Sequence, residues 1–191
     1  MLGKTAAHIF WIFRYLERCE NTARLINASH FISLTQKQNI ANHWDSILNV
    51  AGNKKSFLSK YGVINKASVI NFTLRDKTNP SSVLSSIENA RKNARIVRNN
   101  LTKELFETIN ETYLKLSEIF RRPINEKNLL NTLSIIRTKC QLTRGTLHGT
   151  MLRDDTYIFA RMGSFIERAD NTSRILDMLS LIHISEPTRP L

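Results

Sequence analysis

Residues 4–33 read KTAAHIFWIFRYLERCENTARLINASHFIS and contain neither glycine nor proline. Apolar side chains recur in this stretch at steps of three and four, the spacing that places them on one face of an α-helix. That face comprises Ile9, Ile12, Phe13, Leu16, Cys19, Ala23 and Ile26. The stretch therefore predicts a long N-terminal helix that packs in the core of the protein.

Helical spacing continues along most of the chain. Further helices are expected over residues 36–50, 102–121, 125–151 and 155–182. Residues 53–78 are compatible with either a short helix or irregular packing. Because strand-like alternation of apolar and polar residues is absent, the sequence predicts an all-α protein, a multi-helix bundle.

Asn79-Pro80 predicts the start of one more helix, because Asn is a preferred N-cap and the fixed φ of proline suits the first helical position. The residues of this helix expected to face the core are Val83, Ile87, Ala90, Ala94, Val97 and Leu101.

The composition is that of one packed domain. The chain has 191 residues, 41% hydrophobic and 23% charged. Lys and Arg number 28 against 16 Asp and Glu, a net charge of +12 that permits an acidic partner, a nucleic acid or an anionic surface. No run of about 18 apolar residues occurs, and the N-terminus lacks a signal-peptide cleavage site. We therefore expect no membrane span and a cytoplasmic location.

The last residues fit the bundle poorly. The segment 182–191 contains Pro187 and Pro190, lacks an apolar period and resembles translated sequencing-adapter sequence. We expect a single helical domain over residues 1–181, followed by a non-native tail. The natural chain is expected to continue in a different sequence.

The most specific pattern is an internal repeat at an offset of 150 residues. Residues 17–26 read ERCENTARLI and residues 167–176 read ERADNTSRIL. Glu, Arg, Asn, Thr and Arg are identical in register, an acid occupies the fourth position of both segments, and both end in an apolar pair. The sequence thus predicts two related helices that carry the same Glu-Arg motif.

Helical geometry places Glu17, Asn21 and Arg24 on one stripe, where neighbouring side chains can bond in sequence. Two interpretations remain open. In the structural one, the motif glutamates bridge arginines between two helices related by a pseudo-two-fold axis. In the functional one, the motifs bind a carboxylate, a phosphate or a peptide group. The candidate residues are Glu17, Arg18, Asn21, Arg24, Glu167, Arg168, Asn171 and Arg174.

These motifs resemble the bacterial alpha-E domain family, a helical family named for its Glu-Arg motif. The first match is Leu16-Glu17-Arg18 with Asn21 to Leu25, preceded by Phe10-Trp11 and Arg14-Tyr15. Further matches in the family's order are Trp44, residues 79–83 (NPSSV), residues 90–95 (ARKNAR) with Arg98, and Arg153-Asp154 before the second motif. The resemblance covers residues 1–180, although Lys92 stands where the family usually has Glu.

The resemblance implies a role in a peptide-synthesis or peptide-tagging system. Such domains are encoded beside, or fused to, circularly permuted ATP-grasp proteins and transglutaminase-like peptidases. It defines no activity for the domain itself. Arg153 and Asp154 lie at the turn before the second motif helix. They are expected to extend the candidate site formed by the two Glu-Arg motifs.

A row of arginines is a second candidate site. Arg91, Arg95 and Arg98 are spaced at i, i+4 and i+7, where like charges repel one another. Acidic neighbours such as Glu88 or Glu104, solvent, or a bound anion must offset this repulsion. The row therefore predicts either a solvated face or a site for an anion or an acidic partner.

Other chemistry has little support in the sequence. Nucleotide-binding and hydrolase motifs are absent, and no Glu-x-x-His pair occurs for a di-iron bundle. Cys19 lies on the apolar stripe, and Cys140 lies mid-helix without an evident base. We predict no catalytic residue, no cofactor and no metal ligand.

Two functions follow from these observations. The first is a non-catalytic accessory or binding component that docks an ATP-grasp enzyme or holds its peptide substrate through the motif residues. The alternative is a basic helical nucleic-acid-binding protein, suggested by the +12 charge. The alternative has less support because the basic residues are spread over most helices and the aromatic residues lie at core-like positions.

Overall fold

The computed structural model describes residues 2–35 and 40–185, and the side chains of residues 2–34 and 44–178. The helices are α1 (Gly3–Thr35), α2 (Ile40–Val50), α3 (Lys54–Tyr61), α4 (Lys66–Leu74), α5 (Val83–Ile96), the 3₁₀ turn η1 (Arg98–Asn100), α6 (Lys103–Ile119), α7 (Glu126–Thr150) and α8 (Asp155–Ser185). No strand occurs in the described ranges. The predicted all-α bundle is confirmed.

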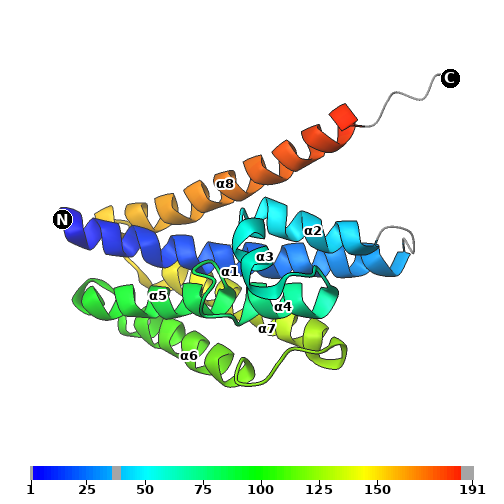
Figure 1. The fold of residues 1–191 in the computed structure, drawn as a ribbon. Coiled ribbons are helices and arrows are strands. Elements are labelled where there is room, and N and C mark those ends of the chain that lie inside the picture. Colours follow the sequence, from blue (N-terminus) through cyan, green and yellow to red (C-terminus); the bar gives the residue numbers. More distant parts are fainter. Residues whose placement is uncertain (1, 36–39, 186–191) are drawn as a thin grey trace.

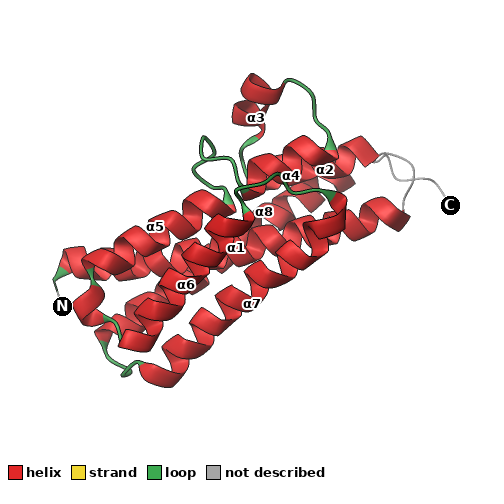
Figure 2. Cartoon of the chain, turned by 90° about the horizontal axis from the view of Figure 1, so that it is seen from below, coloured by secondary structure: helices red, strands yellow, loops and turns green. Residues whose placement is uncertain are grey.

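Four of the helices close a ring. Helix α1 packs against α5 and α7, and α6 packs against both of these (Figure 2). The predicted apolar face of α1 is buried along its whole length, from Ile9 to Ile26. Burial of this face, rather than helix propensity, is the main source of the stability of such a helix.

The two motif helices lie side by side, with α8 outside this ring. Figure 1 shows α8 running along α1 in the same direction before its C-terminal part diverges. The helices approach closely at Gly163, where a Cβ would overlap the carbonyl oxygen of Phe10 and lie 3.3 Å from the backbone nitrogen of Arg14. Helix α2 packs against both α1 and α8, and α3 and α4 pack against α2. This arrangement leaves a space between α1, α2 and α8.

The predicted N-cap at Asn79 is wrong. Helix α5 begins at Val83, and the hydroxyl of Ser82 accepts a hydrogen bond from the backbone nitrogen of Ser85 at 3.2 Å. The side chain of Asn79 instead closes a turn, because its Oδ1 accepts from the backbone nitrogen of Ser81 at 3.0 Å. The same helix ends at Ile96, earlier than the predicted apolar series.

The remaining boundaries differ from the predicted ones by a few residues. Residues 53–78 contain the two short helices α3 and α4, and α2 is described from Ile40, since 36–39 lie outside the described residues. Helix α8 continues through 182–185, which were predicted to belong to the tail, whereas 186–191 lie outside the described residues. None of the described helices is long and apolar enough to cross a membrane.

Candidate functional site

The Glu-Arg dipeptides of α1 and α8 exchange ion pairs. Arg18 donates through Nε to Oε1 of Glu167 at 2.6 Å and through Nη2 to Oε2 at 3.0 Å. Arg168 donates in the same way to Glu17, at 2.9 and 3.2 Å. Such paired guanidinium–carboxylate contacts are strong and geometrically specific. These are the interhelix ion pairs that the structural interpretation expected; a common origin of the two helices stays a prediction.

Both motif glutamates have additional arginine partners that the sequence did not predict. Nε of Arg14 donates to Glu167 at 2.7 Å, and Nη2 of Arg144 on α7 donates to Glu17 at 3.0 Å. Glu17 and Glu167 are only 3% and 4% exposed, so each buried carboxylate needs these donors. The sequence held no signal for Arg144, because nothing in the spacing of α7 distinguishes it from a solvated arginine.

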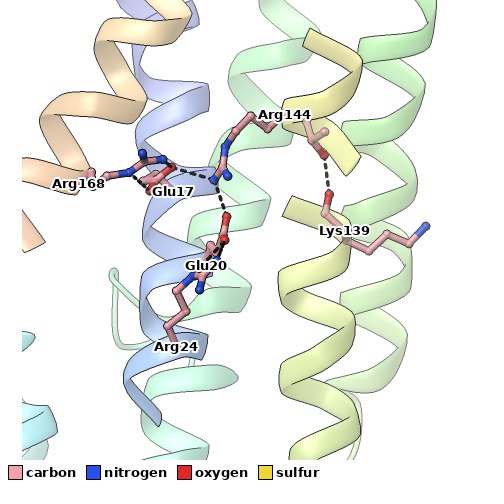
Figure 3. A network of polar contacts seen from close by, with 7 residues as sticks. Glu17, Glu20, Arg24, Lys139, Arg144 and Arg168 are labelled. Atoms are coloured by element: carbon pink, nitrogen blue, oxygen red, sulfur yellow. Dashed lines mark hydrogen bonds and ion pairs between the residues drawn. The ribbon is translucent and has the colours of Figure 1, made fainter. Parts of the chain in front are cut away.

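The expected bonding along the stripe from Glu17 through Asn21 to Arg24 is wrong. Arg24 donates to Glu20, one turn earlier, through Nε at 3.1 Å and Nη2 at 2.6 Å. The carboxylate is preferred because hydrogen bonds between two charged groups are about twice as strong as neutral ones. Arg144 bridges Glu17 and Glu20, which joins α7 to α1 (Figure 3).

Burial and ion pairing together set the protonation of this cluster. Burial alone would raise the pKa of Glu20, but the hydrogen bonds from Arg24 and Arg144 outweigh it and hold the pKa below its ordinary value. Burial would lower the pKa of Arg18, yet its hydrogen bonds with Glu167 raise the pKa overall. The cluster therefore consists of charged groups that hold one another in place.

The Glu-Arg dipeptides of this cluster match the description of one protein family. A family model described as a predicted alpha-helical domain with a conserved ER motif matches residues 1–188. The chain belongs to the Alpha-E family. The ER motif that names this family is present twice in the chain, at residues 17–18 and 167–168. No curated protein matches the chain, and no solved structure matches it.

A pocket of about 140 Å³ lies beside the ER pairs of this Alpha-E domain. It is bounded by α1, α2 and α8 and by the turn before α5. Five of the predicted residues line it, namely Arg18, Asn21, Glu167, Asn171 and Arg174. The structure thus brings together side chains from both motifs in one cavity.

Other polar residues of the pocket were not predicted as site residues. They are Thr22, Asn53, Thr73, Asn79, Ser81 and Asp170. The NPSSV segment carried a signal for two of them, but its asparagine was interpreted as a helix cap. Asp170 also had a signal, because the fourth position of both motifs is acidic. Asn53 enters the pocket through the turn after α2, which the periodicity of the sequence does not place.

The other motif residues support the helices without lining the pocket. Glu17, Arg24 and Arg168 belong to the ion-pair cluster and do not line the pocket. Only one arginine of each motif, Arg18 from the first and Arg174 from the second, reaches the cavity. The structural interpretation therefore accounts for the ion-paired residues, and the functional interpretation stays a prediction for those that line the pocket.

The arginine row contacts helix α6. Nε of Arg91 donates to the side-chain oxygen of Asn110 at 2.7 Å, and its guanidinium lies 4.5 Å from the ring centre of Tyr113. Arg98 lies in η1, beyond the end of α5, over the ring of Phe106 at 4.9 Å, whereas Arg95 is exposed. Aromatic rings on α6 thus take the place of the predicted acidic neighbours for two of the arginines.

Neither Glu88 nor Glu104 pairs with the row in the described structure. Glu88 pairs with Lys92 at 3.0 Å, and Glu104 lies in the first turn of α6. Lys92 therefore takes the acid that was expected to face an arginine.

Arg153 and Asp154 do not extend the pocket. Oδ1 of Asp154 accepts from the backbone nitrogen of Tyr157 at 3.2 Å, so this residue caps the start of α8, and Arg153 is exposed. At a rise of 1.5 Å per residue, Asp154 lies about 24 Å along α8 from Asp170. Their role is at the opposite end of the motif helix.

Both cysteines are buried away from the pocket. Burial raises the pKa of Cys19 to about 12 and also raises the pKa of Cys140, so both thiols stay protonated. Cys19 donates weakly to the carbonyl oxygen of Val83 at 3.6 Å. Within the described residues, no group of three His, Cys, Asp or Glu side chains is placed to hold a metal ion.

Proposed function

We propose that this Alpha-E domain is a non-catalytic binding component that holds a small ligand between its two motif helices and acts beside a peptide-forming enzyme. The observation that carries the proposal is a cavity of about 140 Å³ that both motifs line with polar side chains, Arg18 and Asn21 from the first and Asn171 and Arg174 from the second. The amide nitrogen Nδ2 of Asn21 is buried and has no hydrogen-bond partner among the described residues. An unsatisfied buried donor costs about 1–3 kcal/mol, a cost that turning this amide toward a ligand would remove.

The state of the carboxylates supports binding over catalysis. Both oxygens of Glu167 accept hydrogen bonds from arginines, and so do both oxygens of Glu17. Neither carboxylate therefore has an oxygen without an ion-pair partner that could accept a proton from a ligand. The pocket therefore offers recognition groups rather than an activated base.

The identity of the partner is proposed from the resemblance to the family. Alpha-E domains are encoded beside, or fused to, circularly permuted ATP-grasp proteins and transglutaminase-like peptidases. An ATP-grasp enzyme activates a carboxyl group and joins it to an amine, so a helical component that holds a peptide or amino acid fits beside it. We propose that such an enzyme is the partner of this chain.

Affinity capture tests the proposal. The tagged chain is incubated at moderate salt with an extract of its host, with and without nuclease treatment, and the captured proteins are identified by mass spectrometry. We expect an ATP-grasp or transglutaminase-like protein. Recovery of only nucleic-acid-binding proteins, lost after nuclease treatment, would contradict the proposal and favour the nucleic-acid alternative.

A matched pair of variants separates a site from a scaffold. Arg174→Met changes the pocket, whereas Arg24→Met changes the equivalent arginine outside it. If the pocket serves the partner system, capture depends on Arg174 more than on Arg24 while the melting temperatures of both variants stay close to that of the parent. Equal capture by all three proteins would place the partner contact elsewhere on the domain.

A further inference from the structure

The side of α8 that faces away from α1 exposes a regular series of residues, most of them apolar. Figure 1 shows no other helix of the described chain over this side. The members of the series follow one another at alternating steps of four and three, and all of them are exposed. They are Ile158, Met162, Phe165, Ala169, Thr172 and Leu176, and we call them the outer stripe of α8.

The outer stripe is a continuous apolar surface. Its four largest side chains are between 42% and 59% exposed. The hydroxyl of Thr172 donates to the carbonyl oxygen of Arg168 at 2.8 Å, so its polar group is already satisfied within the helix. Single exposed apolar residues are common on protein surfaces, whereas a contiguous apolar patch is typical of an interaction surface.

The spacing of the outer stripe favours a helix as the partner. Alternating steps of four and three are the heptad spacing of a coiled coil, in which each apolar side chain fits between four side chains of the facing helix. From Ile158 to Leu176 the stripe runs about 27 Å, at a rise of about 1.5 Å per residue. A facing helix of about five turns would cover it.

Arginines border one edge of the outer stripe. The guanidinium groups of Arg161 and Arg168 lie 4.6 and 5.7 Å from the ring centre of Phe165. Arg168 pairs with Glu17, whereas Arg161 donates to the hydroxyl of Tyr157 at 3.2 Å and forms no ion pair in the part of the chain that the structure describes. This edge therefore presents positive charge beside the largest side chain of the stripe.

The opposite edge has no matching charges. The equivalent positions there hold Phe159 and Ile166, which are apolar. A second copy of α8 packed antiparallel would bring the two arginine edges together, where like charges repel, and a parallel copy would place the arginines against the apolar edge. An anionic membrane surface would favour basic residues along both edges. The one-sided charge instead favours a facing helix with acidic residues along one edge.

We propose that the outer stripe of α8 docks an amphipathic α-helix of a partner protein that carries aspartate or glutamate along the edge facing Arg161 and Arg168. Charge complementarity supports this partner, because carboxylates there would form charge-assisted hydrogen bonds with a chain of net charge +12. No residue of the outer stripe lines the pocket between α1, α2 and α8. The inference therefore goes beyond the proposed ligand-binding function and does not depend on it.

Three synthetic peptides of three heptads each test the assignment. The first carries leucine at the two seam positions of each heptad and glutamate at both edges. The second replaces the glutamates by lysine, and the third replaces the leucines by glutamine; a covalent staple on the outer face holds each peptide helical. Each labelled peptide is titrated with the full chain at about 150 mM salt, and the fluorescence anisotropy is followed. We expect the first peptide to bind and the others to bind at least about tenfold more weakly.

Variants of the stripe locate the binding surface. Phe165→Ser and Ile158→Ser should each lower the affinity for the glutamate peptide by about tenfold or more. Leu114→Ser on α6 is the matched control, because Leu114 is similarly exposed but its helical neighbours at steps of three and four are polar. Melting temperatures show which variants fold. Should Phe165→Ser fail to fold, Ile158→Ser decides the test, because the structure places no arginine on that side chain.

A charge reversal tests the arginine edge separately. Arg161→Glu should reduce the preference for the glutamate peptide over the lysine peptide by about tenfold. An unchanged preference in the folded variant would overturn the charge assignment. Equal binding of the two peptides by the parent chain would have the same consequence.

The remaining outcomes overturn the proposal. Peptide binding that is absent, or that Phe165→Ser and Ile158→Ser leave unchanged, would show that the outer stripe is not the docking surface. A dimer in analytical ultracentrifugation that Ile158→Ser converts to a monomer would identify a second copy as the occupant. Binding to phosphatidylglycerol vesicles that the same substitution abolishes would identify a membrane surface. None of these results bears on the pocket, which the capture experiment with Arg174→Met tests separately.

Discussion

Helices α1 and α8 carry the same motif in different surroundings. Helix α1 is enclosed by α2, α5, α7 and α8, whereas α8 packs mainly on α1 and α2. Arg24 on α1 therefore pairs with the buried Glu20, while the equivalent Arg174 pairs with the half-exposed Asp170 and reaches the pocket. Identical residues in identical register thus have different roles, because the neighbouring helices decide which side chains stay accessible.

The two motifs divide their residues between ion pairs and the pocket in different ways. A repeated polar motif therefore does not need to form a symmetric site. The first copy is joined to α7 through Arg144, whereas the second places Arg174 at the pocket.

The largest effect is expected from the two buried glutamates. Glu167→Gln weakens the contacts of Arg14 and Arg18, whose side chains are 18% and 23% exposed, so the free energy of unfolding should fall by about 3 kcal/mol or more. Glu17→Gln should cost less, because its partner Arg168 is 48% exposed and can regain water. Urea denaturation of both variants measures the difference. A larger loss for Glu17→Gln would contradict this order of the two glutamates.

The close approach of the motif helices is tested at Gly163. A helical Gly→Ala substitution ordinarily stabilises a protein by up to about 1 kcal/mol. At Gly163 the new Cβ would overlap the backbone of α1, so Gly163→Ala should destabilise by about 1–3 kcal/mol. Gly145→Ala on α7, where nothing lies within 4 Å of the added Cβ, is the control and should be neutral or stabilising. Thermal unfolding measures both variants. If the two substitutions changed the melting temperature in the same direction, the result would argue against the close contact at Gly163.

Acid should weaken the ion pairs that Glu20 on α1 forms with Arg24 and Arg144. The pKa of Glu20 in the folded protein is held below its ordinary value of 4.5. The ionised Glu20 therefore contributes stability that is complete above the unfolded pKa and is lost as the pH falls from about 4.5 through the folded pKa. Melting temperatures between pH 7 and pH 3 should fall less steeply in Glu20→Gln than in the parent. Asp170→Asn, which alters an exposed pair, should keep the parent's slope.

The smallest effect on stability is expected at the two equivalent arginines. Arg24 and Arg174 are about half exposed, so Arg24→Met and Arg174→Met should each change the free energy of unfolding by less than about 1 kcal/mol. Their effects on partner capture should differ, with loss of capture in Arg174→Met alone. Affinity capture with both variants measures this, and equal capture would remove the functional difference between the helices.

The helices were predictable from the sequence because their apolar spacing is regular. The face of α1 from Ile9 to Ile26 is buried as its periodicity indicates, and α6 and α7 begin directly after Thr102 and Asn125, which cap them. The start of α5 was misplaced, because an asparagine can cap a helix or close a turn. Here its bond to Ser81 favours the turn.

The pocket was predictable only in part. The repeat identified Arg18, Asn21 and Arg174, but the pocket also needs Asn53 and Asn79 from turns whose position depends on tertiary packing. The aromatic partners of Arg91 and Arg98 were not predictable for a similar reason, since the rings that stack on these arginines come from a different helix, α6. The spacing of residues in the sequence predicts the helix face on which a residue lies. Tertiary packing determines which other side chains that residue contacts.

The pairing of α1 with α8 has a consequence for the order of folding. During synthesis α1 emerges long before α8, so Glu17 lacks its partner Arg168 until the motif of α8 has been made. Contacts so far apart in the chain also form late, because closing a long loop costs entropy that only the finished interface repays. We expect the ring of α1, α5, α6 and α7 to form first and α8 to dock onto it afterwards. A ligand in the pocket would then hold closed the part of the domain that assembles last and opens first.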